Sequence, residues 1–76
     1  MNERRHIGQL SNGEEAQLGD MKLPEAAAGR LAEMGLLPGT TVRMIRRAPL
    51  GSPIEFEVGG ARLALRQADA AQIFIQ

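Results

Sequence analysis

The sequence predicts a mainly β fold: a small barrel of about five strands, with a short helix between strands 1 and 2 and a helical turn near the C-terminus. Three observations predict it. Residues 54–66 alternate apolar and polar side chains around two glycines, residues 24–34 carry a helical apolar stripe, and glycine or proline marks the connections. A chain of 76 residues buries roughly 60% of its unfolded surface, so its core is small.

The beginning of the chain is polar, and residues 1–9 are expected to form a disordered or frayed tail. The folded domain is expected over residues 10–76. A first strand is expected within residues 14–23, where Gly19-Asp20 interrupts the alternation as a β-bulge or bend would. The sequence has no apolar run typical of a signal peptide or a membrane span.

Residues 24–34 predict a helix. Three apolar residues share one face of it at helical spacing: Ala27, Leu31 and Met34. Gly35 supplies the left-handed residue that ends the helix. Leu36 follows where a Schellman cap places its apolar contact, here against Leu31.

A turn and a second strand follow. Residues 37–40 fit a type II turn, with proline second and glycine third. Residues 41–48 are rich in β-branched side chains and predict a strand. Its two faces are expected to carry Val42 and Met44 on one side, and Arg43, Ile45 and Arg47 on the other. Residues 49–53 are bounded by prolines and predict a loop.

Residues 54–66 predict a β-hairpin with a two-residue turn at Gly59-Gly60. That turn sets the register, and the expected opposed pairs are Ile54–Leu65, Phe56–Leu63, Glu57–Arg62 and Val58–Ala61. Both apolar sets then lie on one face, and a shift of one residue would move them into water. Residues 67–72 are expected to form one helical turn, and residues 73–75 a last strand that closes the barrel against the first.

Several kinds of chemistry lack the residues they need. There is no cysteine, so disulfides and thiolate metal sites are excluded. His6 is the only histidine and is better interpreted as a solvated residue than as a metal ligand. Ser11 and Ser52 have no partner histidine in a recognisable motif, and the glycines form no phosphate-binding loop. We therefore expect no enzyme activity, no cofactor and no resident metal.

Arginines and leucines near the turns are the candidates for contact with a partner. Arg46-Arg47, with Arg43 nearby, forms either a solvated strand face or a contact for an acidic surface. Leu37 and Leu50 either close the barrel ends or form an apolar docking patch. The candidate partner-binding residues are Leu36, Leu37, Arg43, Arg46, Arg47 and Leu50. Exposed leucines or an unpaired edge strand could also promote self-association into a homo-oligomer.

The run RLAEMGLLPGTTVRMIRRAPLGSPIEFEVGGARLALR, residues 30–66, closely resembles the FeoA family of bacterial ferrous iron transport. The resemblance continues through GARLALRQADAAQIFI and covers about residues 10–75. It implies an SH3-like barrel, a cytoplasmic location, and a role beside FeoB, a membrane transporter with a cytosolic GTP-binding domain. It implies no catalytic or metal-binding residue.

The resemblance therefore predicts an accessory or regulatory protein that docks on the cytosolic part of FeoB without inserting into the membrane. Three alternatives stay open. One is a detached SH3-like domain of the kind found in iron-dependent repressors, and another is an iron sensor that binds Fe(II) itself. The third is a small barrel that binds nucleic acid through its arginines, although zero net charge and only two aromatic residues disfavour it.

Overall fold

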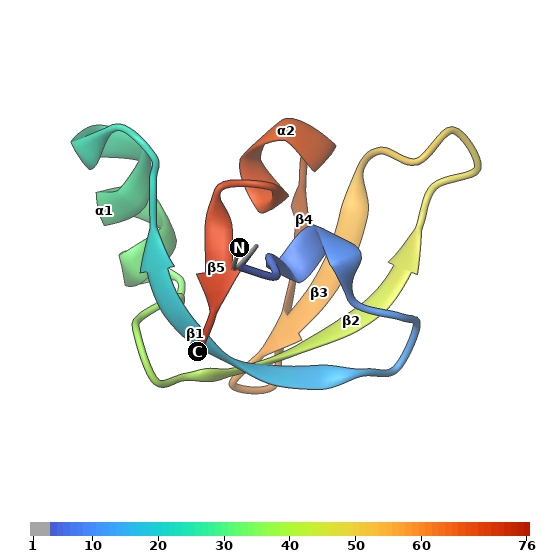
Figure 1. The fold of residues 1–76 in the computed structure, drawn as a ribbon, viewed down its shortest axis with the longest axis horizontal. Helices are drawn as coiled ribbons and strands as arrows, with labels where there is room; N and C mark the ends of the chain where they lie inside the picture. The colour runs from blue at the N-terminus through green and yellow to red at the C-terminus, as the bar shows by residue number, and fades with distance from the viewer. Residues whose placement is uncertain (1–3) are drawn as a thin grey trace.

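The computed structural model describes residues 4–76 and contains one curled antiparallel sheet over that range (Figure 1). Its five strands are β1 (Glu15–Met21), β2 (Thr41–Arg47), β3 (Ile54–Val58), β4 (Ala61–Leu65) and β5 (Ile73–Ile75). They are arranged in the order β4-β3-β2-β1-β5. The helical elements are η1 (Ile7–Gln9), α1 (Glu25–Glu33) and α2 (Gln67–Ala70). The predicted five-stranded β fold, with a helix between the first two strands, is confirmed.

The core lies inside the curl of the sheet, and residues outside the strands also contribute to it. Leu36 enters it from the end of α1, and Ala70 enters it from α2. The buried apolar residues are Ile7, Leu10, Leu18, Leu36, Val42, Met44, Ile54, Phe56, Val58, Leu63, Leu65, Ala70 and Ile73. A single sheet of short strands therefore closes its core with side chains from the connecting segments.

The β3–β4 hairpin has the register that the sequence predicts. The opposed pairs are Ile54–Leu65, Glu55–Ala64, Phe56–Leu63, Glu57–Arg62 and Val58–Ala61. Gly59 and Gly60 have φ of 58° and 84°, the positive values that a two-residue hairpin turn requires. Alternate residues of β3 are fully buried, so pattern and turn specify the same pairing.

The register between β2 and β3 contains an irregularity that no sequence pattern predicts. Met44 opposes Phe56, but Arg46 opposes Glu55, so Ile45 is the extra residue of a β-bulge. Beyond the bulge the alternation is shifted, and Arg47 opposes the buried Ile54. The expected common face of Arg43, Ile45 and Arg47 is therefore wrong, because the bulge places Arg47 on the opposite side from Arg43.

The end of α1 confirms the predicted cap. The Leu36 N–H donates to the Leu31 carbonyl at 2.9 Å, and Gly35 has φ of 100°, which together form a Schellman motif. Leu36 is 1% exposed and packs in the core. Met34, expected on the packed stripe, is instead 50% exposed. The helix is thus attached mainly through its C-terminal end, and none of its own residues is fully buried.

Two further connections follow the prediction. The Thr40 N–H donates to the Leu37 carbonyl at 3.0 Å, and Gly39 has φ of 87°, as a type II turn requires. β5 pairs with β1, with a register shift between Leu18 and Met21 where the sequence predicted a bulge. α2 is shorter than the expected 67–72 turn. No helix within residues 4–76 has the length and apolar character needed to cross a membrane.

The expected frayed tail is wrong for residues 4–9; residues 1–3 of that expectation lie outside the described residues. Ile7–Gln9 forms the short helix η1, and Ile7 is completely buried. The Ile75 N–H donates to the Arg5 carbonyl at 2.9 Å, and His6 forms a β-bridge with Phe74. Ile7 fills a core position although its neighbours are polar, so the overall polarity of residues 4–9 wrongly predicted disorder.

Candidate docking surface

The leucines predicted to contact a partner occupy different environments. Leu36 is part of the core and its side chain is closed to a partner. Leu37 is 49% exposed, and Leu50 is 96% exposed. α1 and the β2–β3 loop lie at opposite ends of the longest axis (Figure 1). Leu37 follows α1 and Leu50 lies in that loop, so the structure does not bring the leucines into one patch.

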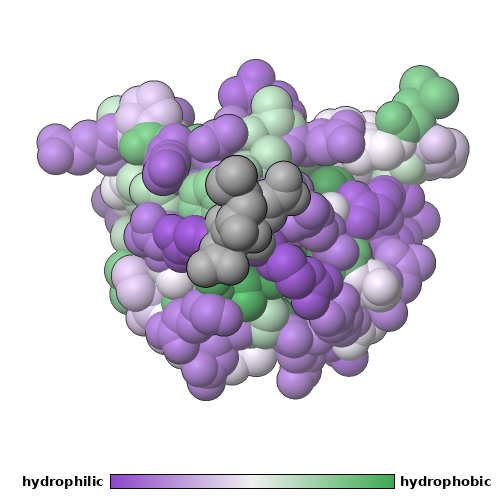
Figure 2. Space-filling view, in the orientation of Figure 1, coloured by the Kyte–Doolittle hydropathy of each residue, from purple (hydrophilic) through white to green (hydrophobic). Residues whose placement is uncertain are grey.

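The β2–β3 loop, residues 48–53, holds Leu50 on a fixed base. The Gly51 N–H donates to the Ala48 carbonyl at 2.8 Å, and the Ala48 N–H donates to the Pro53 carbonyl at 2.9 Å. The backbone N–H of Gln67, at the start of α2, donates to the Ser52 hydroxyl at 3.0 Å. Figure 2 shows an apolar projection at the place of this loop, rising above a mostly hydrophilic surface.

The local sequence explains why the loop turns here. Proline fixes φ near the value that the second position of a turn requires, and Pro49 occupies that position in residues 48–51. Gly51 follows with φ of 90°, a conformation that other residues rarely adopt. Leu50 lies between the two and projects away from the sheet. An ordered loop with an almost fully exposed leucine is a candidate binding element.

Two exposed arginines flank this loop. Arg46 pairs with Glu55 at 3.2 Å, and its side chain is 70% exposed. Arg66, which precedes α2, pairs with Asp69 at 3.2 Å and is 80% exposed. Exposed pairs of this length contribute little stability, so either guanidinium can turn to a carboxylate on another surface at small cost. Arg66 was not among the predicted contact residues; its proximity to the loop arises through the Ser52 contact with α2.

The other two predicted arginines have different roles. Arg43 pairs with Glu57 at 2.6 Å on the outer face of the sheet. Arg47 donates from Nη2 to the carbonyl of Leu10 at 3.0 Å and so contacts the N-terminal segment. Arg46 therefore lies beside the Leu50 loop with a largely exposed side chain, whereas Arg43 pairs on the outer face of the sheet and Arg47 contacts the N-terminal segment.

Met34 and Leu37, at and just after the end of α1, are also exposed apolar residues. Met34 continues the apolar stripe of the helix with Ala27 and Leu31, a pattern that predicts a packed side chain. Met34 is the C-terminal cap residue, and the backbone turns away there toward the left-handed Gly35. The glycine that follows Met34 is therefore a sequence signal that the helix ends at this methionine and that its side chain can be exposed.

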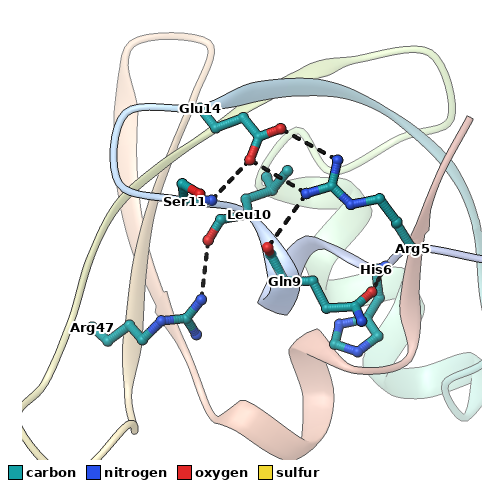
Figure 3. Close-up of polar contacts among 7 residues, drawn as sticks. All are labelled: Arg5, His6, Gln9, Leu10, Ser11, Glu14 and Arg47. Atoms are coloured by element: carbon teal, nitrogen blue, oxygen red, sulfur yellow. Dashed lines mark hydrogen bonds and ion pairs between the residues drawn. The ribbon is translucent and has the colours of Figure 1, made fainter.

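Polar contacts hold the N-terminal segment to Glu14, just before β1, and to Arg47 of β2 (Figure 3). Arg5 pairs with Glu14 at 3.3 Å, and Glu14 also accepts from the Ser11 N–H at 2.8 Å. The Ser11 hydrogen bond and the Arg5 guanidinium together lower the pKa of the Glu14 carboxyl. Burial, and secondly the charge of Arg47, lower the pKa of His6.

A second charged cluster surrounds Phe74. The Arg4 guanidinium lies 4.8 Å from the ring centroid and the Lys22 ammonium lies 5.7 Å from it, which are cation–π distances. Arg4 also forms an ion pair with Asp20. Hydrogen bonding to Arg4 lowers the pKa of Asp20. This cluster covers the half-buried ring and links residue 4 to β1.

No group of three or more histidine, aspartate or glutamate side chains that could hold a metal ion occurs within residues 4–76. Over the same residues the surface contains no pocket. His6, expected to be solvated, is half-buried beside Phe74.

The chain matches the family model of the FeoA domain over residues 5–76. It is 27% identical over 70 residues to a Fe(2+) transport protein A/Fe(2+) transporter FeoB fusion protein of Porphyromonas gingivalis. That match covers 92% of this chain but only 8% of the fusion protein's length.

Solved structures of similar proteins have the same fold. The FeoA protein of Chlorobium tepidum is 30% identical with a TM-score of 0.87, over 93% of this chain and 70% of that one. The zinc-complexed FeoA of Stenotrophomonas maltophilia, described as a procaryotic SH3 domain protein, is 30% identical with a TM-score of 0.78, covering 95% and 89%. The predicted SH3-like architecture is thus confirmed. A manganese-dependent transcriptional repressor shares the fold alone, at 15% identity and a TM-score of 0.84 over 100% of this chain and 37% of that one.

Proposed function

The chain belongs to the FeoA family, and from that premise we propose that it is an accessory or regulatory protein of bacterial ferrous iron uptake that docks on the cytosolic GTP-binding domain of FeoB. The similarity to part of a FeoA–FeoB fusion protein carries the proposal. Fusion keeps two modules at a high effective concentration, which is useful when they act on each other. The proposal includes a role without catalysis and a cytoplasmic location, at the inner membrane through the partner.

We infer that the β2–β3 loop is the main docking element. Burial of a leucine side chain stabilises a complex by roughly 1.5–3 kcal/mol, and Leu50 is 96% exposed before binding. The hydrogen bonds at the base of the loop already order its backbone, so docking loses less conformational entropy. Arg46 and Arg66 beside the loop suit a partner surface with an apolar socket bordered by carboxylates.

Binding to a nucleic acid is less well supported. Arg43, Arg46 and Arg66 each already contact a carboxylate, so phosphates would have to compete with these groups. The formal net charge is zero, which gives little long-range attraction to a polyanion.

The test is titration of the purified chain against the cytosolic domain of FeoB from the same organism. Leu50→Asp places a charge in the proposed apolar contact, and we expect roughly a tenfold or greater loss of affinity. Leu37→Asp is the matched control, because it makes the same change at the other end of the molecule. We expect it to bind as the wild type does.

The outcomes separate the two parts of the proposal. If the wild-type chain does not bind, docking on this domain is wrong. If Leu37→Asp loses affinity and Leu50→Asp does not, docking holds but the end of α1 replaces the loop as its site. Both variants change exposed side chains, so circular dichroism should show the wild-type fold for each.

A further inference from the structure

Residues 4–10, called the strap below, cover one edge of the sheet and complete the core. The Ile75 N–H donates to the Arg5 carbonyl at 2.9 Å, so the strap pairs with the outer edge of β5. Ile7 is 0% exposed and Leu10 is 1% exposed. The strap thus acts as a short additional strand followed by two apolar anchors. Detaching it would uncover both a strand edge and an apolar seat in the barrel.

A small set of side-chain contacts attaches the strap to the rest of the fold: Arg4 forms an ion pair with Asp20 of β1, and Figure 3 shows the contacts of Arg5 and Leu10. Arg47 of β2 donates to the Leu10 carbonyl at 3.0 Å. Arg5 pairs with Glu14 at 3.3 Å. Two further bonds lie within the strap: the His6 N–H donates to the Gln9 side chain at 2.9 Å, and Arg5 Nη2 donates to the Gln9 carbonyl at 3.4 Å. The attachment of the strap to the sheet therefore depends on a small number of side-chain contacts.

His6 is enclosed in a way that suits only its neutral form. Its Nδ1 atom is buried and has no hydrogen-bond partner among the described residues. A Cβ atom at Gly8 would lie 3.1 Å from that nitrogen and 3.2 Å from Cε1, so the ring packs directly against the strap backbone. A neutral imidazole needs only one donor, whereas an imidazolium carries an N–H on both nitrogens. Protonation would thus create a buried donor without an acceptor, which is costly.

The charges around His6 oppose its protonation as well. Arg47 of β2 is the charged group that acts on it, and it has the same sign as an imidazolium. β5 contributes the uncharged ring of Phe74. The carboxylates of Glu14, Asp20 and Asp69 are each paired with an arginine: Arg5, Arg4 and Arg66, respectively. Among residues 4–76, no carboxylate offsets the effect of burial and of Arg47 on the pKa of His6.

We propose that residues 4–10 form an acid-sensitive strap, in which protonation of His6 loosens the segment and exposes the β5 edge and the seat of Ile7 and Leu10. Burial lowers the pKa of His6 in the folded protein below its ordinary value of 6.5, so the neutral imidazole contributes its full stabilisation of the strap above pH 6.5. This stabilisation is lost as the pH falls from 6.5 through the lower pKa that His6 has in the folded protein. Because Ile7 and Leu10 also hold the strap, acid raises the frequency of local opening while the sheet stays folded.

The experiment is amide hydrogen exchange by NMR at about pH 7.5 and about pH 5.5, expressed as protection factors so that the intrinsic pH dependence of exchange is removed. The amides of Gln9, Leu10 and Ile75 report on the strap, because each makes a hydrogen bond within it or to it. The β3–β4 hairpin serves as the internal reference. We expect a severalfold loss of strap protection at the lower pH and none in the hairpin.

His6→Gln keeps a polar side chain and removes the titration. Its strap protection should be independent of pH over this range, whereas Glu15→Gln, an exposed change on β1, should keep the wild-type dependence. Wild-type protection that does not change with pH overturns the proposal, and so does a His6→Gln strap that opens with acid as the wild type does. If the strap of His6→Gln is open at both pH values, the variant does not test the proposal, and NMR titration of the wild-type His6 imidazole tests it instead. A midpoint that coincides with strap opening supports the proposal, and a different midpoint contradicts it.

Discussion

The β3–β4 hairpin and the N-terminal strap bury similar aliphatic side chains but specify their positions differently. In the hairpin, alternate residues enter the core and the turn fixes each opposed pair. In the strap, Ile7 and Leu10 are buried within a segment that is otherwise polar. The two hairpin strands pair with each other through a local turn, and β3 also pairs with β2, whereas the strap contacts β5, α2, β2 and, through Arg4, β1. Burial therefore does not require a recognisable local pattern.

This difference also concerns stability. Opening the hairpin exposes Phe56, Ile54 and their partners and would disrupt the whole sheet. Opening the strap exposes only its two anchors and one strand edge, and β1 to β4 keep their pairing. We therefore expect the strap to open locally while the hairpin opens only with global unfolding. The following substitutions test this contrast, from the largest expected effect to the smallest.

Phe56→Ala should have the largest effect. The ring is completely buried, and its removal should lower the free energy of unfolding by about 3–5 kcal/mol. Urea denaturation followed by circular dichroism measures it. Phe74→Ala is the matched control, since that ring is only half-buried, and we expect a smaller loss. Equal losses would mean that the hairpin is no more central to the core than β5.

Ile7→Ala should rank second and decides whether the strap belongs to the core. Loss of a fully buried isoleucine should cost about 2–3 kcal/mol, at the lower end of the usual range because the strap can open by itself. Ile45→Ala, at the half-buried bulge, is the control and should cost less. If Ile7→Ala has the wild-type midpoint in urea, Ile7 adds nothing to global stability, and a midpoint equal to that of Ile45→Ala would contradict the expected ranking.

Glu14→Gln should have a smaller, pH-dependent effect on stability, because it weakens the contact of Glu14 with Arg5 of the strap. Its pKa is lowered by the Ser11 N–H and by Arg5, so the wild type is stabilised above about pH 4.5. That stabilisation should disappear as the pH falls through the lower folded value. Thermal melts across this range should show a shallower decline for Glu14→Gln than for the wild type. Parallel curves would show that the Arg5–Glu14 contact does not hold the strap in solution.

The outer face of the sheet should give the smallest effect. A double-mutant cycle on Arg43 and Glu57 should yield a coupling of about 0.2–1 kcal/mol, because both side chains are partly exposed. Raising the salt concentration should reduce it. The same cycle on Arg62 and Glu57 should give less, although these residues are directly opposed, because Glu57 bonds to Arg43 in the structure. A larger coupling to Arg62 would contradict this preference.

Much of the fold could be predicted because the signals are local. Gly35 and Leu36 specify the helix cap, residues 37–40 specify the type II turn, and Gly59-Gly60 specifies the hairpin register. The bulge at Ile45 could not be predicted, because no glycine or proline marks it and it arises where β2 must curve along β3. The bulge also decides which arginines share a face.

The candidate docking surface was only partly predictable. Leu37 and Leu50 looked equivalent in the sequence, since both lie in turns bounded by proline or glycine. The structure distinguishes them: Leu50 is almost completely exposed on a loop tied to α2, and Leu37 is half exposed at the other end. The contact between Ser52 and Gln67 joins residues fifteen positions apart, and no short-range pattern encodes it.

The sequence by itself determined the strands, the capped helix, the turns and the hairpin register, because each depends on the φ preferences and side-chain alternation of neighbouring residues. Only the tertiary structure decided that Ile7 and Leu10 are buried, that Leu50 is almost fully exposed, and that the charge of Arg47 acts on His6. These features depend on which distant segments meet once the sheet has curled. A single apolar or titratable residue carries no periodic signal, so its environment becomes known only when its neighbours are in place.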